Sequence, residues 1–211
     1  MTAPDPIPVA LVGFGYAGET FHAPLIAACP GLRLHTVVSS RPEQVRERWP
    51  QVRVVADLDE ALADVGVELV VIAAPNAEHA PLARRALNAG RAVVVDKPFT
   101  LTLAEAKALA QLGETRGRLL SVFHNRRWDA DFLTLQGLIE ANRLGRIVRF
   151  ESRFNRYRPQ VRDRWREGAG PGGGIWYDLG PHLLDQALLL FGLPERVTAN
   201  LARLRPGARA D

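Results

Sequence analysis

Short apolar runs alternate along the first part of the chain with longer segments whose apolar residues recur every three or four positions. The runs lack the apolar–polar alternation of a half-exposed strand, so they indicate strands buried on both faces. Such strands build a parallel sheet with helices on both sides and right-handed crossovers. We expect strands at residues 7–12, 32–39, 52–55, 69–74, 92–95 and 119–123, and helices at 19–29, 79–89 and 102–116.

The pattern changes after about residue 123. Residues 128–142 have the spacing of a long amphipathic helix, and from Val148 to Asn155 apolar or small residues alternate with polar ones. A period of two indicates a sheet with one buried face, which is typical of antiparallel strands. A helix at about 176–190 and a strand at 197–204 are expected to follow. We therefore predict an α/β protein with a doubly wound parallel sheet in a first domain, 1–122, followed by a partial α+β domain, 123–211, with an open-faced, mainly antiparallel sheet.

A glycine motif joins the first expected strand to the first expected helix, Gly13-Phe14-Gly15-Tyr16-Ala17-Gly18. Gly13 permits a tight turn, Gly15 lets the backbone approach a pyrophosphate, and Gly18 lets the helix pack on the strand. Amides at the start of the helix would then face the phosphates. A glycine turn without a ligand is the alternative, but its place in a repeating β/α pattern favours a dinucleotide site, in which all six residues are candidate contacts.

The residues after the second expected strand indicate which cofactor is used. They are Ser39, Ser40 and Arg41, with no acid before Glu43. An NAD site usually places an acid here, which bonds the ribose 2′-hydroxyl and would repel a 2′-phosphate. Two hydroxyls and a guanidinium would instead hold a 2′-phosphate through charge-assisted hydrogen bonds. We therefore predict NADP rather than NAD, the alternative being that Arg41 merely meets solvent.

Polar residues also follow three other expected strands, as Pro75-Asn76, Lys97-Pro98 and His124-Asn125. In an open doubly wound sheet the ligand lies beyond the carboxyl ends of the strands, so we expect these residues to face one crevice. Lys97 is the first candidate for chemistry, because only two of the 27 basic residues are lysines. A lysine amine can be tuned to donate or accept a proton, whereas a guanidinium cannot.

In the second domain Asp178 and His182 are four residues apart on one face of an expected helix, with Asp185 a further turn along. Three interpretations are open: a pair of metal ligands, a capping residue at the helix start, or a base with its orienting carboxylate. No other histidine or cysteine has ligand spacing nearby, and the glycines at 172–174 permit close approach of a ligand. We therefore favour the base and its carboxylate, and expect no metal.

Composition excludes several classes of protein. No apolar run approaches the ~20 residues that cross a bilayer, and the N-terminus lacks the pattern of a signal peptide, so we expect the cytoplasm and no membrane partner. The single Cys29, expected to pack in a helix, permits no internal disulfide. The net charge of +4 arises in residues 119–211, where five arginines between 156 and 166 are expected to include surface charges and ligand contacts. We expect no nucleic acid, which would leave the glycine motif, Lys97 and His182 unexplained.

Four segments carry a family resemblance. They are the glycine motif with His22 and Pro24, Ala74-Pro-Asn-Ala-Glu-His79, Val95-Asp-Lys-Pro98, and Gly172-Gly-Gly-Ile-Trp-Tyr-Asp-Leu-Gly-Pro-His182. Together they resemble the Gfo/Idh/MocA oxidoreductases, and the resemblance covers the whole chain. Residues 121–128, 158–166 and 39–41 are most similar to the NADP-dependent scyllo-inositol dehydrogenase branch.

The resemblance implies a Rossmann domain and hydride transfer between NADP and a secondary alcohol of a cyclic polyol or sugar. It implies that Lys97 contacts the nicotinamide ribose of the cofactor and the reacting hydroxyl, where it stabilises the developing alkoxide. It also implies that Asp178 positions the substrate and that His182 takes the hydroxyl proton. The Glu-Lys-Pro motif of the family appears here with Asp96 in first place, which keeps the charge and shortens the side chain. The further residues implied are Pro75, Asn76, His79 and Asn125 for the cofactor, and Arg127, Tyr157 and Trp165 for the substrate. Capping or packing is the alternative for His79 and Tyr157.

Members of the family usually continue beyond this length and form homo-oligomers through the outer face of the second sheet. The resemblance therefore implies an incomplete second domain, with homo-oligomers expected for full-length relatives rather than for this chain. An NADP-binding module or regulator without turnover is the alternative function, since the same fold serves both roles.

Overall fold

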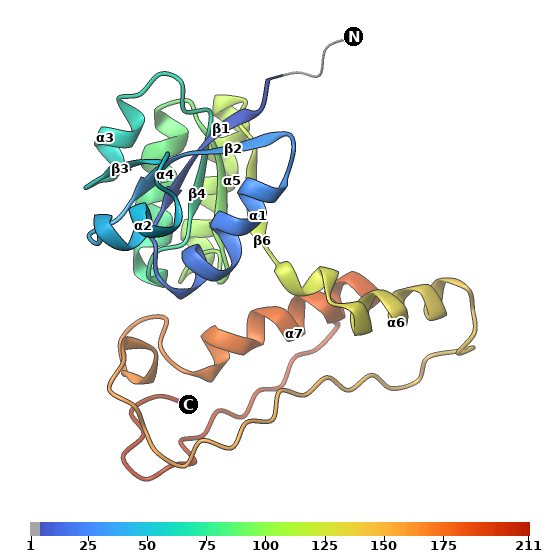
Figure 1. Cartoon of the computed structure of the whole chain (residues 1–211). Helices are drawn as coiled ribbons and strands as arrows, with labels where there is room; N and C mark the ends of the chain where they lie inside the picture. The colour runs from blue at the N-terminus through green and yellow to red at the C-terminus, as the bar shows by residue number, and fades with distance from the viewer. Residues whose placement is uncertain (1–4) are drawn as a thin grey trace. The chain divides into compact units, whose positions relative to one another are not determined.

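The chain forms two compact units, Met1–Phe123 and His124–Asp211 (Figure 1). The computed structural model describes residues 5–211. Within that range, no helix combines the length and the apolar character needed to cross a membrane.

The first unit is built on a sheet of six strands in the order β3-β2-β1-β4-β5-β6 (Figure 1). Every neighbouring pair is parallel, so the parallel sheet predicted from the apolar runs is confirmed. Successive strands are added on one side up to β3 and on the other side from β4, so β1 and β4 form the switch point at which such sheets bind ligands. The strands are β1 Ile7–Val12, β2 Leu32–Val38, β3 Arg53–Val55, β4 Leu69–Ile72, β5 Ala92–Asp96 and β6 Leu120–Phe123.

Alternate residues of β1 enter two apolar clusters, one on each face of the sheet. Val9 and Leu11 pack with residues of α1 and α2, whereas Ala10 and Val12 pack with residues of α3, α4 and α5. Because both faces are removed from water, each strand position favours an apolar residue, which explains the absence of alternation. The helices are α1 Ala23–Ala28, α2 Pro42–Arg48, α3 Leu58–Leu62, α4 His79–Asn88 and α5 Leu103–Arg116.

Two helix starts show what local sequence can and cannot determine. The Thr102 hydroxyl accepts the amide of Glu105 at 3.2 Å, and the Glu105 carboxylate accepts the amide of Thr102 at 3.0 Å, which is the capping box that the sequence predicts. The helix expected at 19–29 instead contains a π turn, η1 Gly18–His22, before α1. Cys29, expected to be packed, is exposed just beyond the end of α1.

The second unit contains two long helices, α6 Ala130–Glu140 and α7 Ile175–Phe191, close to the predicted ranges. Two short 3-10 turns accompany them, η3 Asn125–Trp128 and η4 Trp165–Glu167. Among the described residues of this unit, the buried apolar side chains are Phe132 on α6 and Leu179 on α7.

The segments expected to be antiparallel strands differ from the prediction. Alternation is present, since Phe150, Ser152 and Phe154 are half-buried between exposed polar residues, but no strand is assigned anywhere in residues 124–211. The two extended segments also run in the same direction (Figure 1): Phe150 lies against Phe191, and Arg205 donates to the carbonyls of residues 158 and 160.

The physical reason for this difference lies in the connection. Helix α7 separates the two extended segments, and a segment–helix–segment crossover returns the chain in the same direction. Alternation reports that one face is exposed and carries no information about strand direction. The antiparallel expectation is therefore corrected for these two segments.

Candidate functional site

The glycine turn after β1 has the geometry of a phosphate cradle. Gly13 has a φ of +96°, and a Cβ there would lie 2.6 Å from the carbonyl oxygen of Ala73 just beyond β4. A Cβ on Gly18 would overlap the carbonyl oxygen of Gly13, whereas no atom lies within 4 Å of where a Cβ on Gly15 would be. Two glycines are therefore required by crowding within the protein, and the third leaves open space. This arrangement fits the approach of a pyrophosphate to Gly15.

The residues between the glycines divide into buried and open ones. The Phe14 side chain is 2% exposed and packs in the cluster with α1 and α2, so only its backbone faces the turn. Tyr16 is 72% exposed and makes an edge-on contact with Phe21. Ala17 is half-buried. Of these candidate contacts, Tyr16 is the one whose side chain is open to a ligand.

Arg41 reaches from the end of β2 to the glycine turn. Its guanidinium donates to the carbonyl oxygen of Phe14 at 2.9 Å, and its backbone amide donates to the Ser39 hydroxyl at 3.0 Å. Ser40 is exposed beside them. The structure therefore brings the predicted 2′-phosphate residues to the predicted pyrophosphate turn, where the exposed Arg41 is anchored through its guanidinium.

The end of β5 carries Asp96, Lys97 and Pro98, and a cis peptide bond joins the last two. The Asp96 carboxylate folds back to accept the Lys97 amide at 2.7 Å, which fixes the backbone just before the lysine side chain. The buried imidazole of His22 faces the same carboxylate at 3.6 Å and packs on the ring of Phe123 at 4.4 Å. Burial raises the pKa of Asp96, but the facing His22 and the amide and charge of Lys97 outweigh this effect and hold the pKa below its ordinary value.

His79 braces the turn that carries Lys97. Its ring is 1% exposed, with Nδ1 at 2.7 Å from the carbonyl oxygen of Pro98 and Nε2 at 3.0 Å from that of Ala74. The ring thus links the chain after β4 to the chain after β5. Sequence analysis took His79 as a cofactor contact with packing as the alternative, and its geometry is that of the alternative. No residue spacing signals this contact, because its partners are main-chain carbonyls.

The other predicted cofactor residues lie at strand ends. Asn76 is 7% exposed and begins the 3-10 turn η2 Asn76–Glu78, directly after the exposed Pro75. Asn125 is half-buried and begins η3 in the second unit.

Asp178 and His182 both lie on α7 but have different surroundings. Asp178 faces two guanidiniums, with Arg156 at 3.8 Å and Arg166 at 4.0 Å, and lines a cavity of the second unit. His182 is 6% exposed and lies edge-on to Phe154, with ring centroids 6.4 Å apart. Helix α7 begins at Ile175, and its N-cap residue is Gly174. Asp178 lies inside the first turn, so the interpretation of Asp178 as the capping residue is wrong. In the described part of the chain, no group of three or more acidic, histidine or cysteine side chains is arranged to hold a metal ion.

The three predicted substrate residues have unequal access. Arg127 is held by Asp185 through two hydrogen bonds of 2.8 and 2.6 Å, which raise the pKa of its guanidinium further. Tyr157 is 91% exposed and lines the cavity, whereas Trp165 lies outside the lining and stacks under the Arg166 guanidinium at 4.9 Å. The two arginines that face Asp178, Arg156 and Arg166, belong to the run at 156–166 that was expected to include both surface charges and ligand contacts, but their nearness to Asp178 could not be told from the sequence.

The doubly wound sheet and the glycine cradle at its switch point define the first unit as a dinucleotide-binding domain. Residues 7–124 match the family described as "Oxidoreductase family, NAD-binding Rossmann fold", and residues 132–211 match its "GFO/IDH/MocA C-terminal domain". The chain belongs to the Gfo/Idh/MocA family of oxidoreductases, as the resemblance implied.

Three curated relatives bear on the function. The uncharacterized oxidoreductase YdgJ of Escherichia coli is 58% identical over 98% of this chain and 60% of its own length. The scyllo-inositol 2-dehydrogenase (NADP(+)) IolW of Bacillus subtilis is 41% identical, over 97% of this chain and 57% of its own. The scyllo-inositol 2-dehydrogenase (NAD(+)) of the same organism is 29% identical, over 87% and 53%. The chain therefore spans roughly half to three fifths of the length of these relatives.

The fold has a close counterpart among solved structures. The oxidoreductase yvaA of Bacillus subtilis superposes with a TM-score of 0.95 at 40% identity, over all of this chain and 60% of that one.

Proposed function

We propose that the protein transfers hydride between NADP and a secondary alcohol of a cyclic polyol or sugar. The observation that carries the proposal is the edge of the first unit, where the glycine cradle, anchored Arg41 and the fixed Lys97 all follow strands at their carboxyl ends. The membership of an oxidoreductase family and the printed activity of IolW support it.

The choice of NADP rests on the end of β2. Ser39, Ser40 and Arg41 offer hydroxyls and a guanidinium to a 2′-phosphate, and no carboxylate stands there to repel it. The pyrophosphate would be held by the turn at Gly15, where the protein leaves open space. Tyr16 and Asn76 would contact the rest of the cofactor.

The chemistry is divided among three side chains. The nicotinamide, when bound, supplies the hydride acceptor or donor. In the oxidative direction an imidazole nitrogen of His182 takes the hydroxyl proton, and the Lys97 ammonium stabilises the negative charge that develops on the oxygen. Asp178 accepts hydrogen bonds from neighbouring hydroxyls and so orients the ring. In the reductive direction His182 returns the proton.

A parallel titration with NADPH and NADH, followed by nicotinamide fluorescence, tests the cofactor. Arg41→Ala should weaken NADPH binding by roughly tenfold to a hundredfold, which corresponds to the loss of one charged hydrogen-bonding contact, and should leave NADH binding unchanged. Arg33→Ala, an exposed arginine on the same strand β2, is the matched control. Equal NADPH affinity in the Arg41 variant would contradict the proposed 2′-phosphate contact.

Turnover tests the chemistry. His182→Ala and Lys97→Met should abolish NADP-dependent oxidation of inositols and sugars while NADPH still binds, and Lys107→Met, the exposed second lysine on α5, should retain full activity. Tight NADPH binding by the unmodified protein without turnover of any polyol would support the alternative, a cofactor-binding module or regulator.

A further inference from the structure

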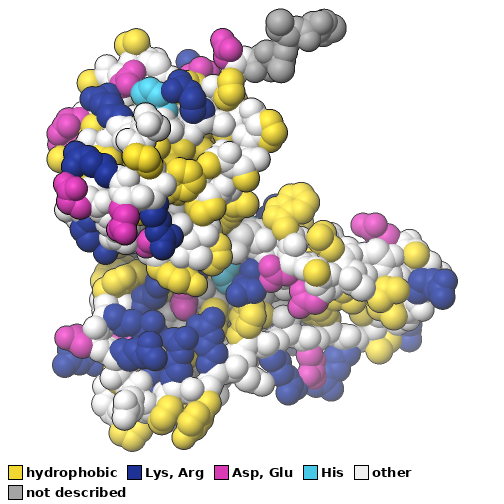
Figure 2. Space-filling view, viewed as in Figure 1, with side chains coloured by type: hydrophobic (Ala, Val, Ile, Leu, Met, Phe, Trp, Pro, Cys, Tyr) yellow, Lys and Arg dark blue, Asp and Glu magenta, His cyan; other side chains and the backbone are white. Residues whose placement is uncertain are grey.

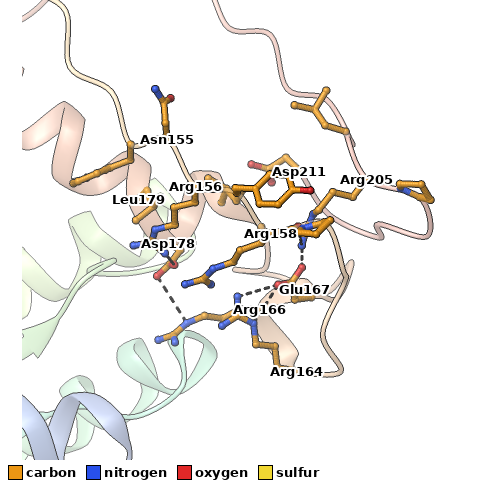
Figure 3. Close-up of a pocket in the computed structure, with 17 residues that line it drawn as sticks. Asn155, Arg156, Arg158, Arg164, Arg166, Glu167, Asp178, Leu179, Arg205 and Asp211 are labelled. Atoms are coloured by element: carbon orange, nitrogen blue, oxygen red, sulfur yellow. Dashed lines mark hydrogen bonds and ion pairs between the residues drawn. The ribbon is translucent and has the colours of Figure 1, made fainter.

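The cavity of the second unit has an excess of positive charge. It has a volume of about 580 Å³ and is lined by five arginines and three acids, namely Arg156, Arg158, Arg164, Arg166, Arg205, Glu167, Asp178 and Asp211 (Figure 3). Lys and Arg side chains also gather on the visible face of this unit in Figure 2. We propose that this cavity binds an anionic group, a carboxylate or a phosphate, on the polyol or sugar that the protein oxidises or reduces.

Two of the five arginines share one buried acid within the protein. Glu167 is 9% exposed and accepts from Arg164 at 2.9 Å and from Arg205 at 2.5 Å. The bond from Arg205, together with Arg164, holds the pKa of Glu167 below its ordinary value despite an opposing contribution from burial. These three residues form a structural cluster that leaves little hydrogen-bonding capacity for a ligand.

Of the other three arginines, two share one acid at long range and the third makes no ion pair within the described residues. Arg156 and Arg166 lie 3.8 and 4.0 Å from the Asp178 carboxylate, beyond the usual hydrogen-bond distance. Within the described residues the Arg158 guanidinium makes no ion pair, and Figure 3 shows it extending toward the Asp178 side of the cavity. The third acid of the lining, Asp211, is engaged elsewhere, because its carboxylate accepts a hydrogen bond from the Trp176 amide at 2.7 Å. The cavity therefore presents guanidiniums that lack close acidic partners.

The chemistry of the lining selects the ligand class. A guanidinium is a planar fork that matches the two oxygens of a carboxylate or phosphate. Phe154, Ile175 and Leu179 supply apolar surface for a ring, and Asp178 can accept from its hydroxyls. A cavity of this volume suits a small molecule. A neutral polyol would satisfy Asp178 and leave the arginine excess without a counter-charge, whereas an acidic polyol satisfies both. This assignment rests on the proposed function, which makes Asp178 the substrate-positioning residue.

Calorimetric titration of the whole chain, saturated with NADP, tests the assignment with two matched pairs of ligands. One pair is glucuronate and glucose, and the other is myo-inositol 1-phosphate and myo-inositol. At least one acidic member should bind roughly tenfold or more tightly than its neutral partner, and the pair that responds tells a carboxylate from a phosphate. The preference should shrink as salt is raised.

Variants place the effect in the cavity. Arg158→Gln should remove the preference for the acidic ligand and leave neutral binding unchanged, and Arg158→Lys should retain part of it because the charge remains. Arg162→Gln is the matched control, an exposed arginine in the same segment and outside the lining. An unchanged acid preference in Arg158→Gln, or equal binding of acidic and neutral ligands by the unmodified protein, would overturn the assignment. Inorganic phosphate binding as tightly as the phosphorylated polyol would overturn it as well.

Turnover separates this assignment from the proposed function. Acid-selective binding that depends on Arg158, without NADP-dependent oxidation of any ligand, would uphold the cavity and reject the dehydrogenase. Turnover of neutral polyols at the same kcat/KM as their acidic partners would uphold the dehydrogenase and reject the cavity.

Discussion

The brace formed by His79 makes a quantitative prediction about the first unit. A neutral imidazole carries one N–H, so His79→Leu removes the single donor that serves one of the two facing carbonyls, those of Ala74 and Pro98. The site is 1% exposed, so water cannot replace this donor without opening the structure. A buried acceptor left without a partner costs roughly 1–3 kcal/mol. One such carbonyl gives a loss of about 1–3 kcal/mol, a substantial share of the ~5–15 kcal/mol that stabilises a typical domain.

Urea unfolding measures this loss directly. With a slope of about 1–3 kcal/mol per molar urea, the midpoint should fall by roughly 1 M. Replacing Trp128, Trp165 and Trp176 with phenylalanine leaves Trp49 as the single tryptophan, so its fluorescence follows the first unit alone. His79→Gln, which keeps an amide donor, should have an unfolding midpoint between those of the unmodified protein and His79→Leu.

The control for this experiment is the histidine on β2. The His35 ring is about one fifth exposed and contacts the Thr36 hydroxyl at 2.8 Å, so His35→Leu should cost less than about 1 kcal/mol. A midpoint for His79→Leu that matches the unmodified protein would refute the reasoning, since a buried carbonyl would then have lost its donor at no cost.

Three further predictions follow from the local geometry. Gly18→Ala should destabilise the first unit by about 1–3 kcal/mol and lose cofactor binding, because its Cβ would strike a backbone oxygen. Gly15→Ala, whose Cβ would lie in open space, should keep its stability and weaken only NADPH binding. Thermal unfolding measures the first effect and NADPH titration the second. The pKa of Asp96 lies below its ordinary value of 3.8, so ionised Asp96 stabilises the fold above that pH and the stabilisation is lost as the pH falls through the folded pKa. In urea titrations the stability deficit of Asp96→Asn at pH 7 should therefore shrink as the pH is lowered below 3.8. Arg127→Gln should lower the free energy of unfolding by at most about 1 kcal/mol, because its ion pair with Asp185 is partly exposed. Asp185→Asn should lower it by the same amount, and the double variant by no more than either. An effect of Arg127→Gln on the substrate KM alone would instead make Arg127 a substrate ligand.

The sequence predicts those features that residue type alone constrains. The turn at Gly13 needs a positive φ, and Gly18 has no room for a side chain, so glycine is required at both positions and is visible in the sequence. The capping box at Thr102 and Glu105 is equally local, because its two partners are three residues apart. Buried strands can likewise be recognised from their apolar composition, which is why the parallel sheet and its strands could be predicted.

Strand direction and contacts with distant backbone were missed because residue type alone does not determine them. The alternation around Phe150 reports an exposed face and not a strand direction, so antiparallel pairing was inferred where the crossover through α7 dictates the same direction. The partner of His79 at Pro98 is a carbonyl nineteen residues away, which any residue would supply. The arginines at 156–166 were visible as a charge run, but their division between Glu167 and Asp178 is set by three-dimensional spacing.

These contrasts indicate how one fold can keep its chemistry while its substrates change. The cofactor side of the candidate site is held by main-chain constraints: crowded glycines, an aspartate folded onto the next amide, and a histidine whose ring nitrogens face two carbonyls. Substitutions there disturb the fold itself, so they are costly. The cavity in the second unit is lined instead by long side chains on irregular segments, with Arg158 free of any ion pair among the described residues. Exchanging such side chains alters charge and shape without breaking the backbone. The arginine segment is therefore where substrate preference within the family should diverge first.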